Sequence, residues 1–149
     1  MKNVRIDTLD VSSPALLDAS LTLIVNAFGD PERYGLERVR RELKSVDPTF
    51  YRQFFVAMAA GSIVGFGGVK AADWASNTHI LYLSAVAPEH RGQGIARALI
   101  KARIDWLKAN FEHGRILVSA AKTKRFRDFG FAAIRKSAIE GRQLLIRKF

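Results

Sequence analysis

The chain has 149 residues, 48% of them hydrophobic and 26% charged, which is typical of one soluble globular domain. It contains no cysteine, and this excludes a disulfide framework, a thiolate nucleophile and a Cys-ligated metal. No apolar run approaches the ~20 residues of a membrane span, and the N-terminal residues lack the apolar core of a signal peptide. We therefore expect a cytoplasmic protein with no membrane partner.

The formal net charge of +10 is concentrated in the last third of the chain. Residues 101–149 carry thirteen Lys and Arg against four Asp and Glu, whereas residues 1–50 carry seven against eight. A field of this kind attracts polyanions, such as a phosphorylated cofactor, an acidic substrate or a nucleic acid. A cationic surface that only favours solubility explains the charge equally well.

The first half of the sequence predicts a strand, two helices and a hairpin. In chain order these are a strand over 4–9, a helix over 14–28, a shorter helix over 36–43, and two strands over 54–58 and 63–69. Ser13 before Pro14 is typical of a helix start, and Asp47-Pro48 is expected to end the second helix. A turn over 60–62 joins the two strands.

The second half predicts an alternation of strands and helices. In chain order these are a loop over 71–77, a strand over 79–86, the longest helix over 95–110, a strand over 115–119, a short helix over 123–129, and a closing hairpin with strands over 131–137 and 142–147. We find no repeat, low-complexity tract or linker. The pattern predicts one mixed α/β domain over residues 1–149.

Two glycines, Gly92 and Gly94, lie where a predicted strand passes into the longest predicted helix. Glycine admits a ligand close to the main chain, and the helix start offers unpaired N–H groups and the positive end of its dipole. Such a loop suits an anion, above all a phosphate, and Arg91 and Arg97 flank it. The spacing is neither the dinucleotide-binding nor the Walker pattern, and a tight turn without a ligand remains the alternative.

Arg91, Gly94 and Ala96 have the spacing Arg-x-x-Gly-x-Ala within the segment from Leu83 to Ile100. This segment resembles the acetyl-CoA-binding signature of the GNAT superfamily of N-acetyltransferases. Residues 126–131 nearly meet a second element of that family, Tyr-x-x-x-Gly-Phe. The order of the predicted elements also agrees with it. The resemblance implies a single α+β domain with a central, mostly antiparallel, splayed sheet flanked by helices.

The resemblance also implies acetyl-CoA as the co-substrate. Main-chain amides from Gln93 to Ala96 would hold the pyrophosphate, and the pantetheine arm would pair with main-chain groups near Val86, in a gap between two strands. Lys122 lies just past a strand end and is expected to attract cofactor phosphate. The residues expected at the cofactor are Ala85, Val86, Arg91, Gly92, Gln93, Gly94, Ile95, Ala96, Arg97, Ser119, Lys122 and Phe126.

The sequence departs from the family at the positions that commonly transfer protons. Phe126 stands where the family commonly has a tyrosine that acts as acid to the leaving thiolate, and Ile80 stands where many members have a glutamate base. Ser119 stands where an asparagine is often found. Cofactor binding is therefore supported by the sequence, whereas the usual acid and base are missing.

Two residues are our candidates for the missing catalytic groups. Ser84 lies on the signature strand and could hydrogen-bond the thioester or a water, although a small polar residue there is often structural. His79 titrates near neutrality, but it lies at the strand entrance, where we expect an exposed surface residue. Strand alternation places Tyr82 on the same face as Ser84, and we expect Tyr82 to be a core residue.

Two functions remain open at this level. The first is an N-acetyltransferase that acts on a primary amine of a small molecule or peptide, with specificity set by the segments 28–36 and 71–77. The second is a non-catalytic module that holds CoA or a nucleic acid, suggested by cations around Phe126 and Phe129. We favour core aromatics beneath a solvated cationic face over a nucleic-acid site. Both a monomer and a homodimer remain open.

Overall fold

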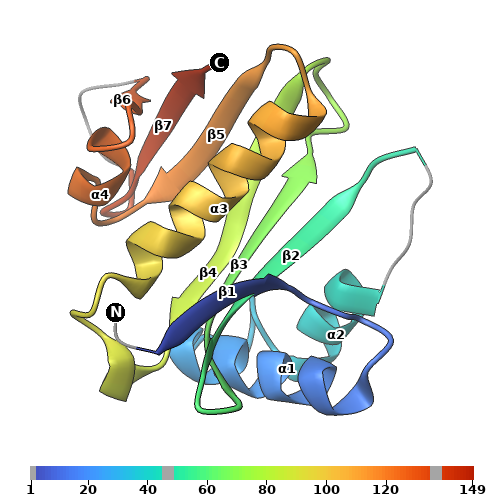
Figure 1. Cartoon of the computed structure of the whole chain (residues 1–149). Helices are drawn as coiled ribbons and strands as arrows, with labels where there is room; N and C mark the ends of the chain where they lie inside the picture. Colours follow the sequence, from blue (N-terminus) through green and yellow to red (C-terminus); the bar gives the residue numbers. More distant parts are fainter. Residues whose placement is uncertain (1–2, 45–48, 135–138) are drawn as a thin grey trace.

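The protein is described here from a computed structural model that covers residues 3–44, 49–134 and 139–149 (Figure 1). The elements are β1 Val4–Thr8, α1 Pro14–Phe28, α2 Leu36–Lys44, β2 Arg52–Ala59, β3 Ser62–Ala71, β4 Thr78–Val86, a 3-10 turn Pro88–His90, α3 Ile95–Asn110, β5 Arg115–Ala120, α4 Lys124–Arg127, β6 Ala132–Ala133 and β7 Gln143–Lys148. Within these ranges no helix has both the length and the apolar composition needed to cross a bilayer.

The predicted elements are present in the predicted order, and the bounds of several strands and of the short helix differ from the prediction. Ser13 accepts a hydrogen bond from the amide of Leu16 at the start of α1, as its position before Pro14 predicts. The first strand of the closing hairpin is only β6, and the rest of that prediction reaches residues 135–138, which lie outside the described residues. Asp47-Pro48, the expected end of the second helix, also lies outside them.

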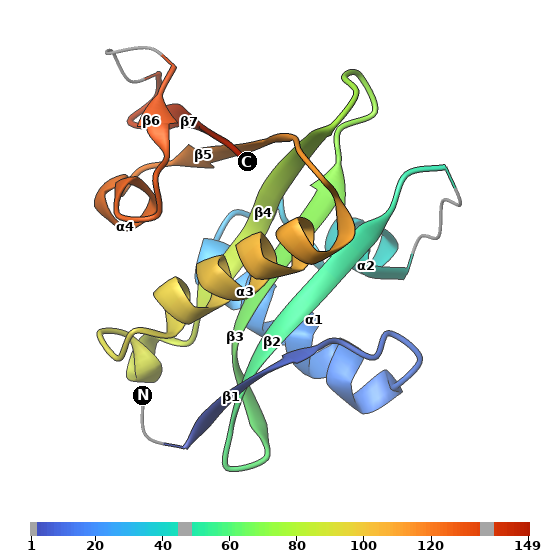
Figure 2. The same cartoon turned by 45° about the horizontal axis from the view of Figure 1, so that its top comes forward.

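The strands form one seven-stranded sheet in the order β1-β2-β3-β4-β5-β7-β6. Neighbouring strands are antiparallel, except for the parallel pair β4 and β5. That pair is joined only from Thr78–Ile80 to Arg115–Leu117, so the rest of β4 has no β5 partner and the two strands diverge (Figure 2). The expected open, mostly antiparallel sheet is confirmed.

Helices cover both faces of the sheet (Figures 1 and 2). On one face, α3 packs its apolar stripe into a core that includes Leu99, Leu107, Phe55, Leu81 and Val118. On the other face, α1 and α2 enclose a second core that includes Leu21, Val39, Phe54, Phe66 and Leu83. The two cores thus pack against both faces of β4.

A bulge in β4 changes which way its side chains face. Leu83 has a φ of +52°, and the register with β3 shifts there. Tyr82 hydrogen-bonds Glu42 of α2, whereas Ser84 contacts Arg103 of α3. The prediction that Tyr82 and Ser84 share one face is therefore wrong, because strict alternation holds only in a regular strand.

Candidate functional site

The glycine loop between β4 and α3 forms an open cradle. Gly92 and Gly94 have φ values of +78° and +82°, in the left-handed region that favours glycine. A methyl group at either position would meet no atom within 4 Å, so the space in front of the loop is free. Gly94 is the N-cap of α3, and no side chain caps this helix end. Free N–H groups and the helix dipole therefore face the space that an anion would occupy.

A cavity of about 590 Å³ opens from this loop and lies along β4, α3 and α4. Nine of the predicted cofactor residues line it, namely Ala85, Val86, Arg91, Gly92, Gly94, Ala96, Arg97, Lys122 and Phe126. Ile95 is instead a core residue with 1% of its surface exposed. Gln93 is not in the lining, and Ser119 lines a neighbouring cavity. The size is that of a small-molecule site.

The neighbouring cavity, of about 850 Å³, lies on the other side of the opening between β4 and β5. Its wall includes the aromatic residues Phe28, Tyr34 and Trp74 and the cations Arg33, Lys122, Arg125 and Arg142. Glu140 is the one acidic residue in the described part of this wall. Arg142 donates to the hydroxyl and carbonyl oxygens of Ser119 at 3.2 and 2.7 Å, which holds its guanidinium at the wall.

The two cavities meet at a short shared wall. Five residues line both of them, namely Phe28, Ser84, Lys122, Arg125 and Phe126. Ser84 is exposed there because the bulge turns it out of the sheet, and Phe126 is 6% exposed and packs edge-on against Phe131. Ligands entering from the two sides would therefore come together beside Ser84 and Phe126.

Behind Ser84 lies a fully buried cation, Arg103 of α3, with 0% of its surface exposed. Its Nε donates to the Leu99 carbonyl at 2.9 Å, and its Nη1 donates to the Gly68 carbonyl at 3.1 Å and to Ser84 Oγ at 3.0 Å. Burial lowers the pKa of Arg103 to about 9, so the guanidinium stays cationic at neutral pH. No carboxylate in the described part of the chain pairs with it.

His79 lies away from both cavities. It is 2% exposed, its Nδ1 is 2.6 Å from the Tyr51 hydroxyl, and its ring centroid is 4.5 Å from that of Phe111. Its Nε2 is buried with no described partner, and burial lowers the pKa of the imidazole. The prediction of an exposed histidine is wrong, because aromatic residues distant in sequence cover the start of β4. His79 lines neither cavity.

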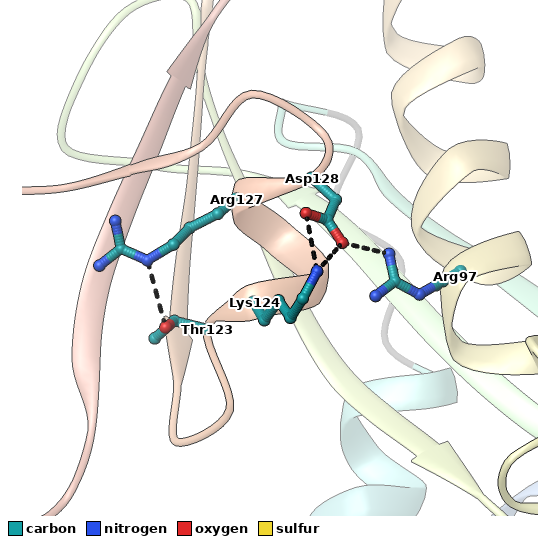
Figure 3. A network of polar contacts seen from close by, with 5 residues as sticks. All are labelled: Arg97, Thr123, Lys124, Arg127 and Asp128. Atoms are coloured by element: carbon teal, nitrogen blue, oxygen red, sulfur yellow. Dashed lines mark hydrogen bonds and ion pairs between the residues drawn. The ribbon is translucent and has the colours of Figure 1, made fainter.

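Arg97, which lines the cavity beside the glycine loop, is paired with Asp128 just after α4 (Figure 3). Its Nη1 donates to Asp128 Oδ2 at 2.8 Å, and Lys124 Nζ donates to the same oxygen at 3.0 Å. The hydrogen bonds from Lys124 and Arg97 lower the pKa of Asp128. On the same short helix, Arg127 donates to Thr123 Oγ1 at 3.3 Å. The carboxylate thus tethers α3 to the segment that carries Phe126.

Glu42 is a partly buried carboxylate that the sequence did not point to. The Tyr82 hydroxyl donates to it at 2.7 Å, Lys70 Nζ donates at 3.3 Å, and Arg52 Nε lies 3.4 Å away. Burial alone would raise the pKa of Glu42, but the Tyr82 hydroxyl and the charges of Lys70 and Arg52 together lower it. Glu42 lines neither cavity, so it holds Tyr82 in place rather than facing a ligand.

The sequence matches the Acetyltransferase (GNAT) family over residues 22–131, and the chain belongs to this family. Among solved structures it is similar to Escherichia coli ElaA, with a TM-score of 0.79, 13% identity and coverage of 97% of this chain and 99% of that one. It is also similar to an acyl-CoA N-acyltransferase from Pseudomonas aeruginosa, with a TM-score of 0.77, 14% identity and coverage of 97% and 99%.

A third similar structure is the PaiA N-acetyltransferase of Thermoplasma acidophilum in complex with coenzyme A. Its TM-score is 0.72 and its identity 14%, with coverage of 98% of this chain and 99% of that one. No match to the sequence was found among curated proteins. The family and the fold identify an acetyltransferase domain, and identities this low carry no information about the acceptor.

Proposed function

We propose that the protein transfers an acetyl group from acetyl-CoA directly to a primary amine. The observation that carries this proposal is the meeting of two cavities at the opening between β4 and β5, one of them ending at an anion cradle. The cradle fits the pyrophosphate of CoA because the space in front of Gly92 and Gly94 is open and the free main-chain N–H groups at the start of α3 point into it. Arg91, Arg97 and Lys122 add positive charge around this cavity.

The protein's own contribution to such a reaction is mainly positioning. The part of β4 after Ile80 has no β5 partner, so its main-chain groups are available to an extended pantetheine arm. Acetyl-CoA supplies an activated acyl carbon, and holding an amine against it in a fixed geometry lowers the barrier by several kcal/mol, on the order of 7–11 in well-oriented cases. Phe126 has no proton to give to the departing thiolate, and Ile80 cannot accept one from the amine, so the proton lost by the amine passes to water.

The acceptor cavity favours an amine that also carries a negative group and an apolar part. Arg125 and Arg142 face this cavity together with the exposed indole of Trp74, which is 67% exposed. Guanidinium groups bind carboxylates and phosphates in bidentate geometry, and the aromatic wall accepts apolar surface. A polyamine would meet repulsion here. We therefore propose a carboxylated or phosphorylated amine as the acceptor.

A non-catalytic module that holds CoA or a nucleic acid is the second candidate. It is favoured by Phe126 and Ile80, which leave both usual proton-transfer positions without an ionisable group, and by exposed cations such as Lys124 on α4. Against a nucleic-acid site, Phe126 is buried rather than offered for base stacking. Nucleic-acid binding would also weaken steeply as salt rises.

The test pairs calorimetry with an assay of thiol release. Acetyl-CoA is titrated into the protein, and release of CoA is then followed with phenylalanine and with phenethylamine, which differ only by the carboxylate. We expect binding, amine-dependent release, and at least a tenfold higher kcat/KM for phenylalanine, since a charged hydrogen bond contributes about 1.5–3 kcal/mol. Arg142→Ala should reduce that preference. Binding without release for any amine would favour the second candidate, and equal rates would reject the anionic acceptor.

A further inference from the structure

Arg103 is a cation that is fully buried, and burying a charge is energetically unfavourable. Its guanidinium is completely buried on α3, and its described hydrogen-bond partners are two carbonyls and the Ser84 hydroxyl. An unpaired buried charge is strongly unfavourable unless something compensates it. Arg103 also lines the cofactor cavity. A ligand that becomes negatively charged beside Ser84 would provide the missing compensation.

The chemistry of the contact fixes the direction of the hydrogen bond. A guanidinium has only donors, so Arg103 donates and Ser84 Oγ accepts at 3.0 Å. The hydroxyl hydrogen of Ser84 is therefore left for another acceptor. Ser84 lines both cavities, so that acceptor lies where the two cavities meet. A hydroxyl that accepts a bond from a cation is itself a stronger donor.

We propose that Arg103 is a positioning residue that holds and polarises Ser84, so that the Ser84 hydroxyl donates to the sulfur of the departing CoA thiolate. This inference rests on the proposed acetyl transfer. In that reaction the amine nitrogen forms a bond to the acyl carbon, the carbon–sulfur bond breaks with its electron pair going to sulfur, and the ammonium proton goes to water. Ser84 keeps its proton throughout and supplies a hydrogen bond.

Ser84 is the one described hydroxyl on the wall shared by the two cavities. Phe126 and Phe28 have no donor, and Ser84 and Lys122 are both exposed, but the Ser84 hydroxyl is held by Arg103 at 3.0 Å. Arg125 is the rival donor, because it is half-buried on the same shared wall. Arg125→Met therefore belongs in the test beside Ser84→Ala.

The first measurement follows ionisation of bound CoA and needs no turnover. The ultraviolet absorbance of the thiolate is recorded against pH for CoA bound to each variant, with desulfo-CoA as the blank. Ser84→Ala and Arg103→Met should each lower the ratio of thiolate to thiol about tenfold at a given pH, equivalent to about one pKa unit of the thiol. The double variant should equal Ser84→Ala. Lys101→Met, on an exposed part of α3 outside both cavities, should match the wild type.

The outcomes separate the inference from the proposed function. An unchanged ratio in Ser84→Ala, additive effects in the double variant, or a loss confined to Arg125→Met would overturn the inference while acetyl transfer could stand. Failure of the wild type to bind CoA would instead reject the proposed function. Should Arg103→Met not fold, Arg103→Lys keeps the charge and should fall between the wild type and Ser84→Ala.

Kinetics give a second, independent readout. Ser84→Ala and Arg103→Met should lower kcat by up to about tenfold and change the KM of the amine less than twofold, because the bond to sulfur strengthens only as charge develops there. Adding Phe126→Tyr to Ser84→Ala places a new donor on the shared wall and should restore most of the lost kcat. A raised KM with an unchanged kcat would contradict the assigned role.

Discussion

Nη1 of Arg97 lies 2.8 Å from Oδ2 of Asp128, so an arginine that lines the cavity beside the glycine loop is held by the acid at the C-terminal end of α4 (Figure 3). The two side chains are 45% and 41% exposed, and an ion pair this exposed contributes little to stability. The main effect of the contact is therefore that Asp128 neutralises part of the positive charge that Arg97 would otherwise offer to an anionic ligand.

Asp128→Asn should raise the affinity for CoA about two- to fivefold at low salt, because it releases Arg97 and Lys124 and removes one negative charge near the cradle. Calorimetry at two salt concentrations measures the effect, which should shrink at high salt. Asp105→Asn is the matched control, since it removes an exposed, Lys-paired acid from α3 outside both cavities. The same gain in CoA affinity in both variants would show that the overall charge of the protein, and not the release of Arg97 and Lys124, causes the effect.

Gly94→Ala should weaken CoA binding at least tenfold. Its φ of +82° costs an alanine about 1–2 kcal/mol, and the added methyl enters the open space in front of the loop. Gly61→Ala is the control, because Gly61 has a φ of +79° and equally open surroundings in the β2–β3 turn, outside both cavities. Both variants should lose similar stability in urea unfolding, and only Gly94→Ala should lose affinity. An equal loss of CoA affinity in both variants would show that the glycine loop is not the binding site of the pyrophosphate.

Gly67→Ala should destabilise the protein by about 1–3 kcal/mol. A methyl group at Gly67 would lie 2.8 Å from Cζ and 2.9 Å from Nε of Arg103, so this glycine provides the room that the buried guanidinium occupies. In an Arg103→Ala background the same substitution should cost much less, which urea unfolding of the four proteins would measure. Equal costs in both backgrounds would mean that Arg103 does not fill that space in solution.

Stability should fall on mild acidification because of His79. Burial lowers the pKa of His79 below its ordinary value of 6.5, so below that pH the unfolded chain binds a proton that the folded chain refuses. The free energy of unfolding should therefore drop by up to about 1.4 kcal/mol per pH unit below 6.5, until the pH reaches the folded-state pKa. His79→Phe should lose this component between pH 7.5 and 5.5. An identical pH dependence in both proteins would contradict the buried state of His79.

Local sequence patterns predicted most of the element order and the glycine loop before α3. Apolar spacing predicted α1 and α3, and the two glycines before α3 predicted an anion cradle whose backbone has the expected left-handed angles. The family resemblance supplied the splayed sheet, which local periodicity does not contain because strand pairing depends on residues far apart in the chain. The structure adds where the β4–β5 pairing stops, at Ile80 and Leu117.

Local sequence patterns did not predict the bulge at Leu83 or the burial of Arg103, which shape the site where the two cavities meet. The bulge at Leu83 reverses the facing of Ser84, and nothing in a run of ordinary strand residues predicts it. Arg103 lies on the face of α3 that carries Leu99 and Leu107, but a charged residue is normally assigned to solvent. The signal for its burial was Gly67 inside a strand, because the missing side chain at this position leaves the room that Arg103 occupies.

Amine-dependent release of CoA from acetyl-CoA tests the central claim most directly. Purified protein is mixed with acetyl-CoA and a panel of carboxylated, phosphorylated and neutral primary amines, and free thiol and N-acetylated product are both measured. The account predicts thiol release above the amine-free rate, matched one to one by acetylated amine and lost in Gly94→Glu. CoA binding with no product from any amine would contradict an enzyme, and absence of CoA binding would contradict the site itself.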